Sequence, residues 1–267
     1  MLPAFEVLRP VSVDEAVGLL DEDNIPYWGG TELLLAMKMG LLVPDGVVDL
    51  KRISELRTIR CEADRLVIGA GATHEEVANN ASVRSVCPLL SDVESRVGNA
   101  RVRAQGTIGG NLCFAEPRSD IATILMALDG QVTLRSSGGI RVVPIAEFML
   151  GAYWTAREPG ELLVDVWLLL PSATGVYLKF QVTERPTVGV AAVVLPGGST
   201  CRLVIGAVGE LPRVFDFPNW ESVDAGALAE AVEPVPDLTG SVEYKRHVTA
   251  VFIRRAIAAI EGAGTDD

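Results

Sequence analysis

The stretch VRAQGTIGGNLCFAEPRSD, Val102–Asp120, carries three glycines among its first nine residues and leads into DIATILMALDG, a run with helical character. Glycine has no Cβ, so the backbone here can take positive φ values and allow a ligand to approach closely. Thr107 and Asn111 flank the pair Gly109-Gly110 with side chains that can form hydrogen bonds. The stretch therefore predicts a ligand-binding turn followed by a helix.

Asp120 stands at the expected start of that helix. An aspartate in this position can cap the helix by accepting hydrogen bonds from backbone N–H groups. It can equally accept hydrogen bonds from the hydroxyls of a ligand. Both roles are compatible with the sequence.

A second glycine turn lies near the N-terminus, in WGGTELL, Trp28–Leu34, where a strand passes through Gly29-Gly30 into a helix. The N–H groups and the dipole at a helix start favour an anion such as a pyrophosphate. The sequence has neither the G-x-G-x-x-G fingerprint nor a G-x-x-x-x-G-K-[ST] loop, since GAGATH has His74 in place of the third glycine. A dinucleotide of the Rossmann type and a nucleoside triphosphate are therefore not supported.

Composition narrows the function classes further. The chain has 267 residues, 49% of them hydrophobic, and a net charge of −12, so it can bury a large core but offers no basic face for nucleic acid or an anionic membrane. The cysteines lack the spacing of a disulfide framework, a zinc site or an iron–sulfur cluster. We expect reduced, mostly buried thiols at Cys61, Cys87, Cys113 and Cys201.

The N-terminus and the length of the apolar runs bear on where the protein resides in the cell. The N-terminus lacks the basic start and apolar run of a signal peptide, and the longest apolar runs, such as LLVDVWLLLP, are too short to span a bilayer. We expect a soluble, cytoplasmic protein with no integral membrane segment.

The order of elements predicts two parts. Strands and helices alternate in the first third of the chain in a βαβ pattern that repeats, and Gly138-Gly139 indicates a hairpin. After about Leu170 come three strand-like runs with short connections, which predict an antiparallel sheet, and then two helices. We place a boundary near Pro171.

Other chemistry-bearing side chains have mainly structural interpretations. His74 and His247 lie in expected helices, and Cys113 follows the second glycine pair, where a packed thiol is favoured over contact with a ligand. On the last helix, a solvated face is favoured over a docking surface for Lys245, Arg246, Arg254 and Arg255.

The two glycine turns resemble a known pair of motifs. VRAQGTIGGN followed by PRSD resembles the second flavin motif of the medium, FAD-binding subunits of molybdenum hydroxylases, the relatives of xanthine dehydrogenase and aerobic carbon monoxide dehydrogenase. WGGTELL resembles their first flavin motif. VVDLKRI, LVIGAGAT, GAYWTAREPGELL and EYKRHVTAVFIRRA resemble further family segments in the same order, so the resemblance covers nearly the whole chain.

The resemblance implies an α+β fold. Residues 1–170 would form an FAD-binding α/β domain of the PCMH type, with two subdomains split near residue 55. Residues 171–267 would form a smaller C-terminal domain of an antiparallel sheet plus helices.

It also implies a cofactor, FAD, and its binding residues, but no catalytic side chain and no metal ligand. The pyrophosphate would be wrapped by Trp28, Gly29, Gly30, Thr31 and Glu32. The second wall of the phosphate and ribityl site would be formed by Thr107, Gly109, Gly110 and Asn111. Asp120 would bind a hydroxyl of the flavin's chain, Leu163 would pack beside the isoalloxazine, and Lys179 would lie near the ring edge.

Two departures from the family pattern stand out. Trp28 replaces a residue that is usually small, and no aromatic occurs between Gln181 and Ala192, where relatives carry one that covers a flavin face. An uncovered ring face could admit a substrate.

The function implied first is that of the flavoprotein subunit of a heterotrimeric molybdenum hydroxylase, which can pair into a dimer. Its partners would be a molybdopterin-binding large subunit and a small subunit with two [2Fe–2S] clusters, and electrons would pass from the clusters through FAD to NAD⁺, oxygen or a quinone. The alternative is a free-standing FAD-dependent oxidoreductase acting on a small organic substrate. A scaffold that has lost its flavin is a third, less favoured class, because both motifs are intact.

Overall fold

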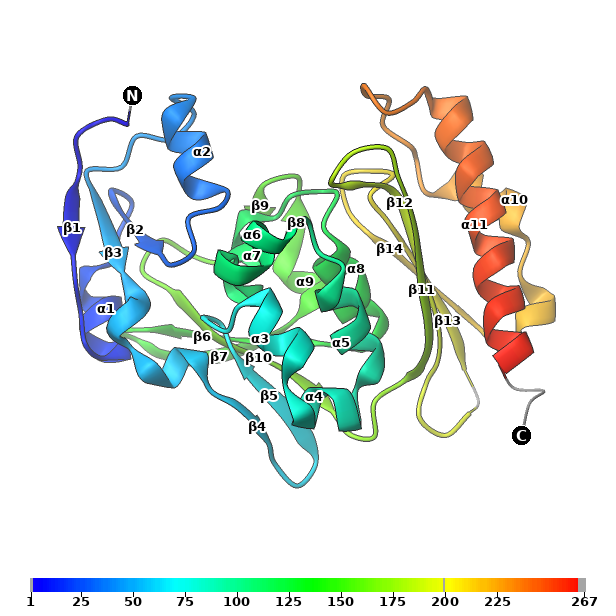
Figure 1. Cartoon of the computed structure of the whole chain (residues 1–267), viewed down its shortest axis with the longest axis horizontal. Coiled ribbons are helices and arrows are strands. Elements are labelled where there is room, and N and C mark those ends of the chain that lie inside the picture. The colour runs from blue at the N-terminus through cyan, green and yellow to red at the C-terminus, as the bar shows by residue number, and fades with distance from the viewer. Residues whose placement is uncertain (1, 199, 264–267) are drawn as a thin grey trace.

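The computed structural model describes residues 2–198 and 200–263. Three sheets follow one another along the longest axis of the molecule, with helices packed between and beside them (Figure 1). The N-terminal sheet lies at one end, and the last two helices lie at the other (Figure 1).

The first sheet is parallel, with strand order β1-β3-β2. Its elements, in chain order, are β1 (Glu6–Leu8), α1 (Val13–Leu19), β2 (Asn24–Tyr27), α2 (Leu33–Lys38) and β3 (Gly46–Asp49). Two 3₁₀ turns, Leu50–Arg52 and Ser54–Arg57, lead from it to the next sheet. This is the expected βαβ pattern, with the side chain of Ser12 capping α1.

The middle sheet is antiparallel, with strand order β4-β5-β10-β6-β7. Its strands are β4 (Ile59–Cys61), β5 (Arg65–Gly69), β6 (Gln131–Ser136), β7 (Gly139–Pro144) and β10 (Leu162–Leu169). The expected hairpin is present between β6 and β7. The expectation that the βαβ pattern repeats is wrong, because β5 pairs antiparallel with β4 and β10. The helix after β5 is therefore not a crossover between parallel strands.

Seven short helices and a two-stranded ribbon pack on this sheet. They are α3 (His74–Asn79), α4 (Ala81–Val86), α5 (Pro88–Ser95), α6 (Ala100–Gln105), α7 (Ile108–Phe114), α8 (Asp120–Ala127), α9 (Ile145–Phe148), β8 (Met149–Gly151) and β9 (Trp154–Thr155). The T-x-x-E spacing of Thr73 and Glu76 forms a capping box at the start of α3, with each side chain bonding the other's backbone.

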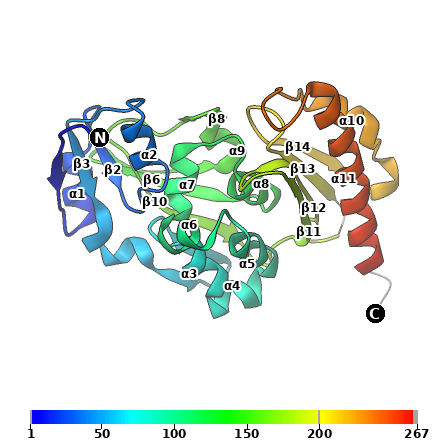
Figure 2. The same cartoon turned by 45° about the horizontal axis from the view of Figure 1, so that its top comes forward.

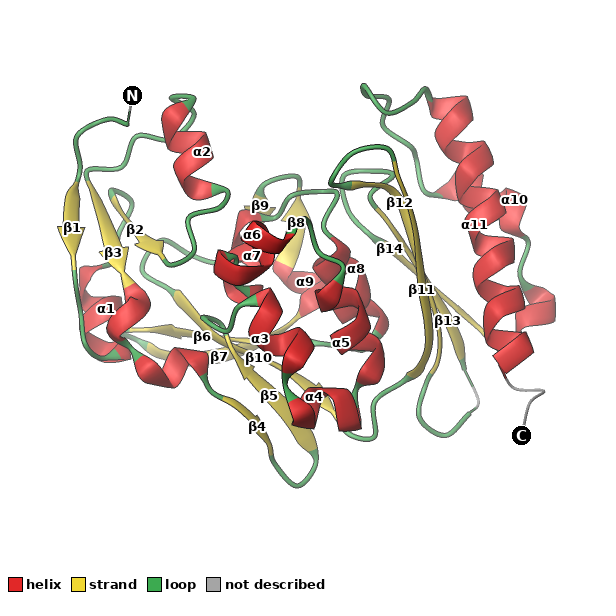
Figure 3. Ribbon diagram, viewed as in Figure 1, coloured by secondary structure: helices red, strands yellow, loops and turns green. Residues whose placement is uncertain are grey.

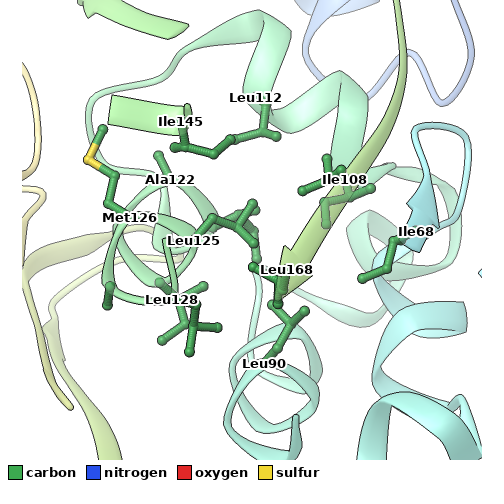
Figure 4. Packing of buried hydrophobic residues seen from close by; sticks show 14 of the residues in the cluster. Ile68, Leu90, Ile108, Leu112, Ala122, Leu125, Met126, Leu128, Ile145 and Leu168 are labelled. Carbon is green, nitrogen blue, oxygen red and sulfur yellow. The ribbon is translucent and has the colours of Figure 1, made fainter. Parts of the chain in front are cut away.

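The core beneath the second glycine motif fixes its position. Ile108 and Leu112 of α7, Leu125 of α8 and Leu168 of β10 are fully buried in one cluster (Figure 4). Burying four large aliphatic side chains stabilises the fold by roughly 1.5–3 kcal/mol each. The burial of Ile108 and Leu112 in this cluster therefore fixes the position of the start of α7.

The third sheet is antiparallel, with strand order β11-β12-β13-β14. It contains β11 (Thr174–Gln181), β12 (Pro186–Val194), β13 (Cys201–Gly206) and β14 (Arg213–Phe217), and it is followed by α10 (Ala225–Ala231) and α11 (Val242–Ala263). Figure 3 shows both helices on its outer face. Three of its strands match the prediction. The sequence analysis missed β14, which is a short, mostly exposed edge strand.

Strand β12 explains why VGVAAVV shows no alternation of polar and apolar residues. Val188 and Val190 join the cluster with α10 and α11, whereas Ala191 and Val193 join the cluster with α8. A strand covered on both faces needs apolar residues throughout.

The last helix does not present its basic residues as one surface. Lys245 is only 2% exposed and its Nζ lies 2.9 Å from Asp237 Oδ2, while Arg246 pairs with Glu230. The solvated face expected for the four basic residues is therefore wrong for Lys245, and the four do not form one docking surface. Within residues 2–198 and 200–263, no helix combines the length and the apolar composition needed to cross a membrane.

Candidate functional site

One cleft brings the two glycine motifs together. It lies between the loop before α2 and the α6–α7 segment, which face each other in two views (Figures 1 and 2). Ten of the twelve expected site residues line it: Trp28, Gly29, Gly30, Thr31, Glu32, Thr107, Gly109, Gly110, Asn111 and Leu163. Asp120 and Lys179 are not among its lining residues.

The first glycine turn is shaped by the protein itself. Gly30 has a φ of +68°, which glycine adopts without steric cost. A Cβ on Gly29 would lie 2.1 Å from the carbonyl oxygen of Gln105, at the end of α6. The first turn therefore packs directly on the backbone that leads into the second motif.

The second glycine pair is not a turn before a helix, as the sequence predicted, but the first turn of helix α7. Thr107 is the N-cap, and its Oγ1 accepts a hydrogen bond of 3.0 Å from the backbone N–H of Gly110. Because the Thr107 hydroxyl caps the helix, α7 begins at Ile108, and the two glycines lie within its first turn.

The two glycines of α7 differ in their surroundings. A Cβ on Gly109 would lie 2.6 Å from the Cβ of Ala70, so this glycine is required by packing. Gly110 is exposed, and a Cβ there would meet only Thr107 Oγ1, at 2.9 Å. Gly110 therefore presents bare backbone to the cleft, and no other side chain of residues 2–198 and 200–263 packs within 4 Å of that side.

Helix α8 is capped by Ser119, so the capping role considered for Asp120 is wrong. Ser119 Oγ accepts hydrogen bonds from the N–H groups of Ile121 and Ala122 and donates one of 2.5 Å to Asn111 Oδ1. This contact joins the start of α8 to the cleft residue Asn111. Asp120 is the next residue, the first of the helix.

Asp120 is bonded on both carboxylate oxygens by strand β11. Tyr177 donates its hydroxyl to Oδ1 at 2.6 Å, and Lys179 Nζ donates to Oδ2 at 2.9 Å and to the carbonyl of Arg96 at 2.8 Å. Burial raises the pKa of Tyr177 well above its ordinary value, and the Asp120 carboxylate raises it further. We call these three residues, Asp120, Tyr177 and Lys179, the α8–β11 joint.

The rim of the cleft is held by Arg185, in the connection from β11 to β12. Its guanidinium donates to both oxygens of Glu32, at 2.6 and 2.8 Å, and to Glu116. Tyr153 donates its hydroxyl to Glu116 at 2.9 Å. Burial alone would lower the pKa of Arg185, but Glu116 and Glu32 raise it. The segment between Gln181 and Ala192, which has no aromatic residue, thus contributes Arg185, whose ion pair with Glu32 links the first motif to the third sheet.

His74 lies on the cleft, whereas His247 is exposed on α11. The His74 ring is 2% exposed, and its Nδ1 lies 2.6 Å from Oε2 of the fully buried Glu94. Glu94 Oε1 has no hydrogen-bond partner among the described residues. Glu94 therefore fixes the orientation of the ring at the cleft floor.

Arg157 and Cys113 also line the cleft. Arg157 was not predicted as a site residue, and for Cys113 a packed thiol was favoured over contact with a ligand. Arg157 NH1 donates to the carbonyls of Glu161 at 2.9 Å and Glu158 at 3.3 Å. Burial raises the pKa of the Cys113 thiol, and the Arg157 guanidinium offsets part of that rise. Arg157 belongs to the quoted segment GAYWTAREPGELL, but a single arginine in a loop carries no periodic signal.

The side chains and backbone of the cleft suit a ligand with phosphates and a polyol. Gly110 leaves room for close approach, Thr31 and Asn111 offer hydrogen-bonding side chains, and Arg157 offers a cation. Apolar side chains at Leu33, Leu42 and Leu163 can cover a ring. This set fits FAD.

The comparisons with known proteins agree with this assignment. A family model described as the FAD binding domain in molybdopterin dehydrogenase matches residues 3–171. The chain is 32% identical to the carbon monoxide dehydrogenase medium chain of Afipia carboxidovorans, over 96% of this chain and 97% of that one. It is 29% identical to the nicotine 6-hydroxylase medium subunit of Paenarthrobacter nicotinovorans, over 96% and 97% of the two chains.

Solved structures show the same relationship in three dimensions. A chain of carbon monoxide dehydrogenase from Hydrogenophaga pseudoflava superposes with a TM-score of 0.90 at 30% identity, covering 98% of this chain and 99% of that chain. A chain of quinoline 2-oxidoreductase from Pseudomonas putida superposes with a TM-score of 0.90 at 28% identity and the same coverage.

Proposed function

This chain belongs to the family of the FAD binding domain in molybdopterin dehydrogenase, and on that premise we propose that its cleft binds FAD through the two glycine motifs. The observation that carries the proposal is the convergence of ten expected residues, from three separate segments (28–32, 107–111 and 163), on one cleft. The first motif, Trp28 to Glu32, would hold the pyrophosphate with its backbone N–H groups. The second motif, Thr107 to Asn111, would form the opposite wall.

The remaining expected contacts are less direct. Leu163 would pack beside the isoalloxazine, with Leu162 next to it on the cleft. A direct contact of Asp120 and Lys179 with the cofactor remains a prediction, because here these two side chains bond to each other. Through Ser119 and Asn111, the start of α8 reaches the cleft wall whether or not Asp120 touches the ligand.

The chain is an FAD-bearing medium subunit of a molybdenum-hydroxylase-type oxidoreductase. Its companions would be a molybdopterin-binding large subunit and a small subunit with [2Fe–2S] clusters. When bound, FAD would supply redox chemistry that links one-electron carriers to a two-electron acceptor. We propose that the route runs from the clusters of the small subunit to this chain, and from there to NAD⁺, oxygen or a quinone.

This chain's own residues have a limited task in such a route. No group of three or more His, Cys, Asp or Glu side chains within the described ranges is placed to hold a metal ion. The protein binds and orients the cofactor, and the apolar wall of Leu33, Leu42 and Leu163 excludes water from part of the cleft. Hydroxylation would then depend on the companion subunits.

The test is co-expression with the neighbouring genes, followed by affinity purification and analysis of flavin, iron and molybdenum. We expect one FAD per copy of this chain, together with iron and molybdenum in the companion subunits, and hydroxylase activity only in the complex. Recovery of the chain alone, with flavin, no metal and turnover of a small organic substrate, would overturn the proposal in favour of a free-standing oxidoreductase.

A further inference from the structure

Arg157 differs from two other ionisable side chains of the cleft, Glu32 and His74, in forming no ion pair within the described part of the chain. The Glu161 carboxylate interacts with its charge but makes no direct contact with its guanidinium. Glu32 is neutralised by Arg185, and His74 is paired with Glu94. Among the described residues, no carboxylate forms an ion pair with Arg157. The nearby Glu161 carboxylate is engaged by Arg141, at 2.6 and 2.7 Å.

The orientation of Arg157 is nevertheless fixed. Its NH1 donates to the carbonyls of Glu158 and Glu161, and its backbone N–H donates to Thr155 Oγ1 at 3.4 Å. These bonds occupy one end of the guanidinium and leave Nε and NH2 without a partner among the described residues. A half-buried guanidinium held in this way is ready to form charge-assisted hydrogen bonds with an anion.

A ligand of the cleft can supply that anion. Arg157 lies on the same cleft as Gly110 and Asn111 of α7. Its charge also acts on the thiol of Cys113, in the same helix α7. The pyrophosphate is the part of FAD that is anionic in every redox state. We propose that Arg157 binds the pyrophosphate of FAD and is the cationic group that makes this cleft prefer FAD over uncharged flavins, an inference that rests on the proposed cofactor site.

The chain offers a matched control in Arg103. This arginine is also half-buried, and its NH1 also donates to two backbone carbonyls, of Val97 at 3.1 Å and Gly98 at 3.4 Å. It does not line the cleft. Arg103→Leu therefore removes an arginine of the same kind from the α6 side of the site without removing a side chain that lines the cleft.

The experiment compares Arg157→Leu, Arg157→Lys and Arg103→Leu in the full-length chain freed of flavin. Dissociation constants are measured for FAD and for riboflavin, which lacks the pyrophosphate, and inorganic pyrophosphate is tested as a competitor of FAD. We expect Arg157→Leu to weaken FAD at least about tenfold, to leave riboflavin within twofold, and to abolish competition by pyrophosphate. Arg157→Lys should restore part of the affinity, and Arg103→Leu should change neither ligand by more than twofold.

Each other outcome overturns the inference in a recognisable way. If Arg157→Leu weakens FAD and riboflavin equally, Arg157 is structural or faces the ring. If FAD binds the variant as tightly as the wild type but its midpoint potential falls, the cation acts on the isoalloxazine. If the wild-type chain binds no FAD at all, the proposed cofactor site fails, which is a different result from loss confined to Arg157→Leu.

Discussion

The cleft and the α8–β11 joint both contain residues expected to bind FAD, and they differ in how far the protein itself satisfies their polar groups. In the joint, Asp120 accepts hydrogen bonds from Tyr177 and Lys179 on both oxygens; Asp120 and Tyr177 are buried, and the Lys179 side chain is only 9% exposed. In the cleft, Gly110 is exposed and Arg157 forms no ion pair among the described residues. Groups that are already satisfied stabilise the fold, whereas groups left open are available to a ligand.

This difference separates stability from binding. A substitution in the joint should act on the folded chain with or without FAD, because it leaves a buried group without its partner. A substitution on the open side of the cleft should leave the apo chain nearly unchanged and weaken the ligand. Four variants test the contrast, in descending order of their effect on the free energy of unfolding of the apo chain.

Asp120→Ala should have the largest effect, on the order of 3 kcal/mol, because it removes one member of a buried ion pair and leaves the Lys179 ammonium without its carboxylate partner. Urea unfolding of the apo and FAD-bound chains measures it, and an equal loss in both forms would show that Asp120 acts through the joint alone. Asp92→Ala is the control, since its ion pair with Arg96 is exposed and should be worth less than about 1 kcal/mol. A loss seen only in the FAD-bound form would instead assign Asp120 to the ligand.

Gly29→Ala should come next, at about 1–3 kcal/mol, because its Cβ would lie 2.1 Å from the Gln105 carbonyl oxygen, and backbone has to move. FAD affinity should fall with it, as both motifs shift. Gly18→Ala is the control: it lies in α1 with nothing within 4 Å of the new Cβ, and should stabilise by roughly 0.5–1 kcal/mol. Thermal melting of the apo chains gives the comparison, and equal melting temperatures for the two variants would contradict it.

Tyr177→Phe should cost about 1–2 kcal/mol near neutral pH, because Asp120 loses one buried hydrogen bond. Burial and Asp120 raise the pKa of Tyr177 in the folded chain above its ordinary value of 10.0. The proton is therefore held more tightly in the folded state, so this contribution is complete below pH 10 and is lost as the pH rises above it. Unfolding measured below and above pH 10 should show the advantage of the wild type shrinking at alkaline pH, and an advantage that grows there would refute the assignment.

Gly110→Ala should have the smallest effect on the apo chain, within about 1 kcal/mol, because the gain in helix propensity opposes the 2.9 Å contact with Thr107 Oγ1. The affinity for FAD should nevertheless fall at least about tenfold, since a methyl group would stand where the ligand approaches. Fluorescence titration with FAD and melting of the apo chain measure the two quantities separately. Unchanged affinity would place the cofactor away from this side of α7.

Much of the fold was predictable because local signals were strong. A few neighbouring residues were enough to indicate each of several features: the caps at Ser12 and Thr73, the hairpin at Gly138 and the three consecutive strands of the third sheet. The antiparallel pairing of β5 was not predicted, because its neighbour β4 is a three-residue strand with no clear hydrophobic pattern, and its other partner, β10, begins 93 residues further along. The edge strand β14 was missed because its exposed residues give no hydrophobic pattern.

The sequence by itself determined that two glycine motifs exist, and through their resemblance to a family it predicted that they form an FAD site, since motif residues and their order are local properties. Only the tertiary structure decided which side of each glycine is open: Gly109 faces Ala70, whereas Gly110 faces the cleft. It likewise paired Asp120 with Lys179, 59 residues away, and left Arg157 without an acid. Burial and pairing depend on contacts between distant segments, so no pattern of neighbouring residues encodes them.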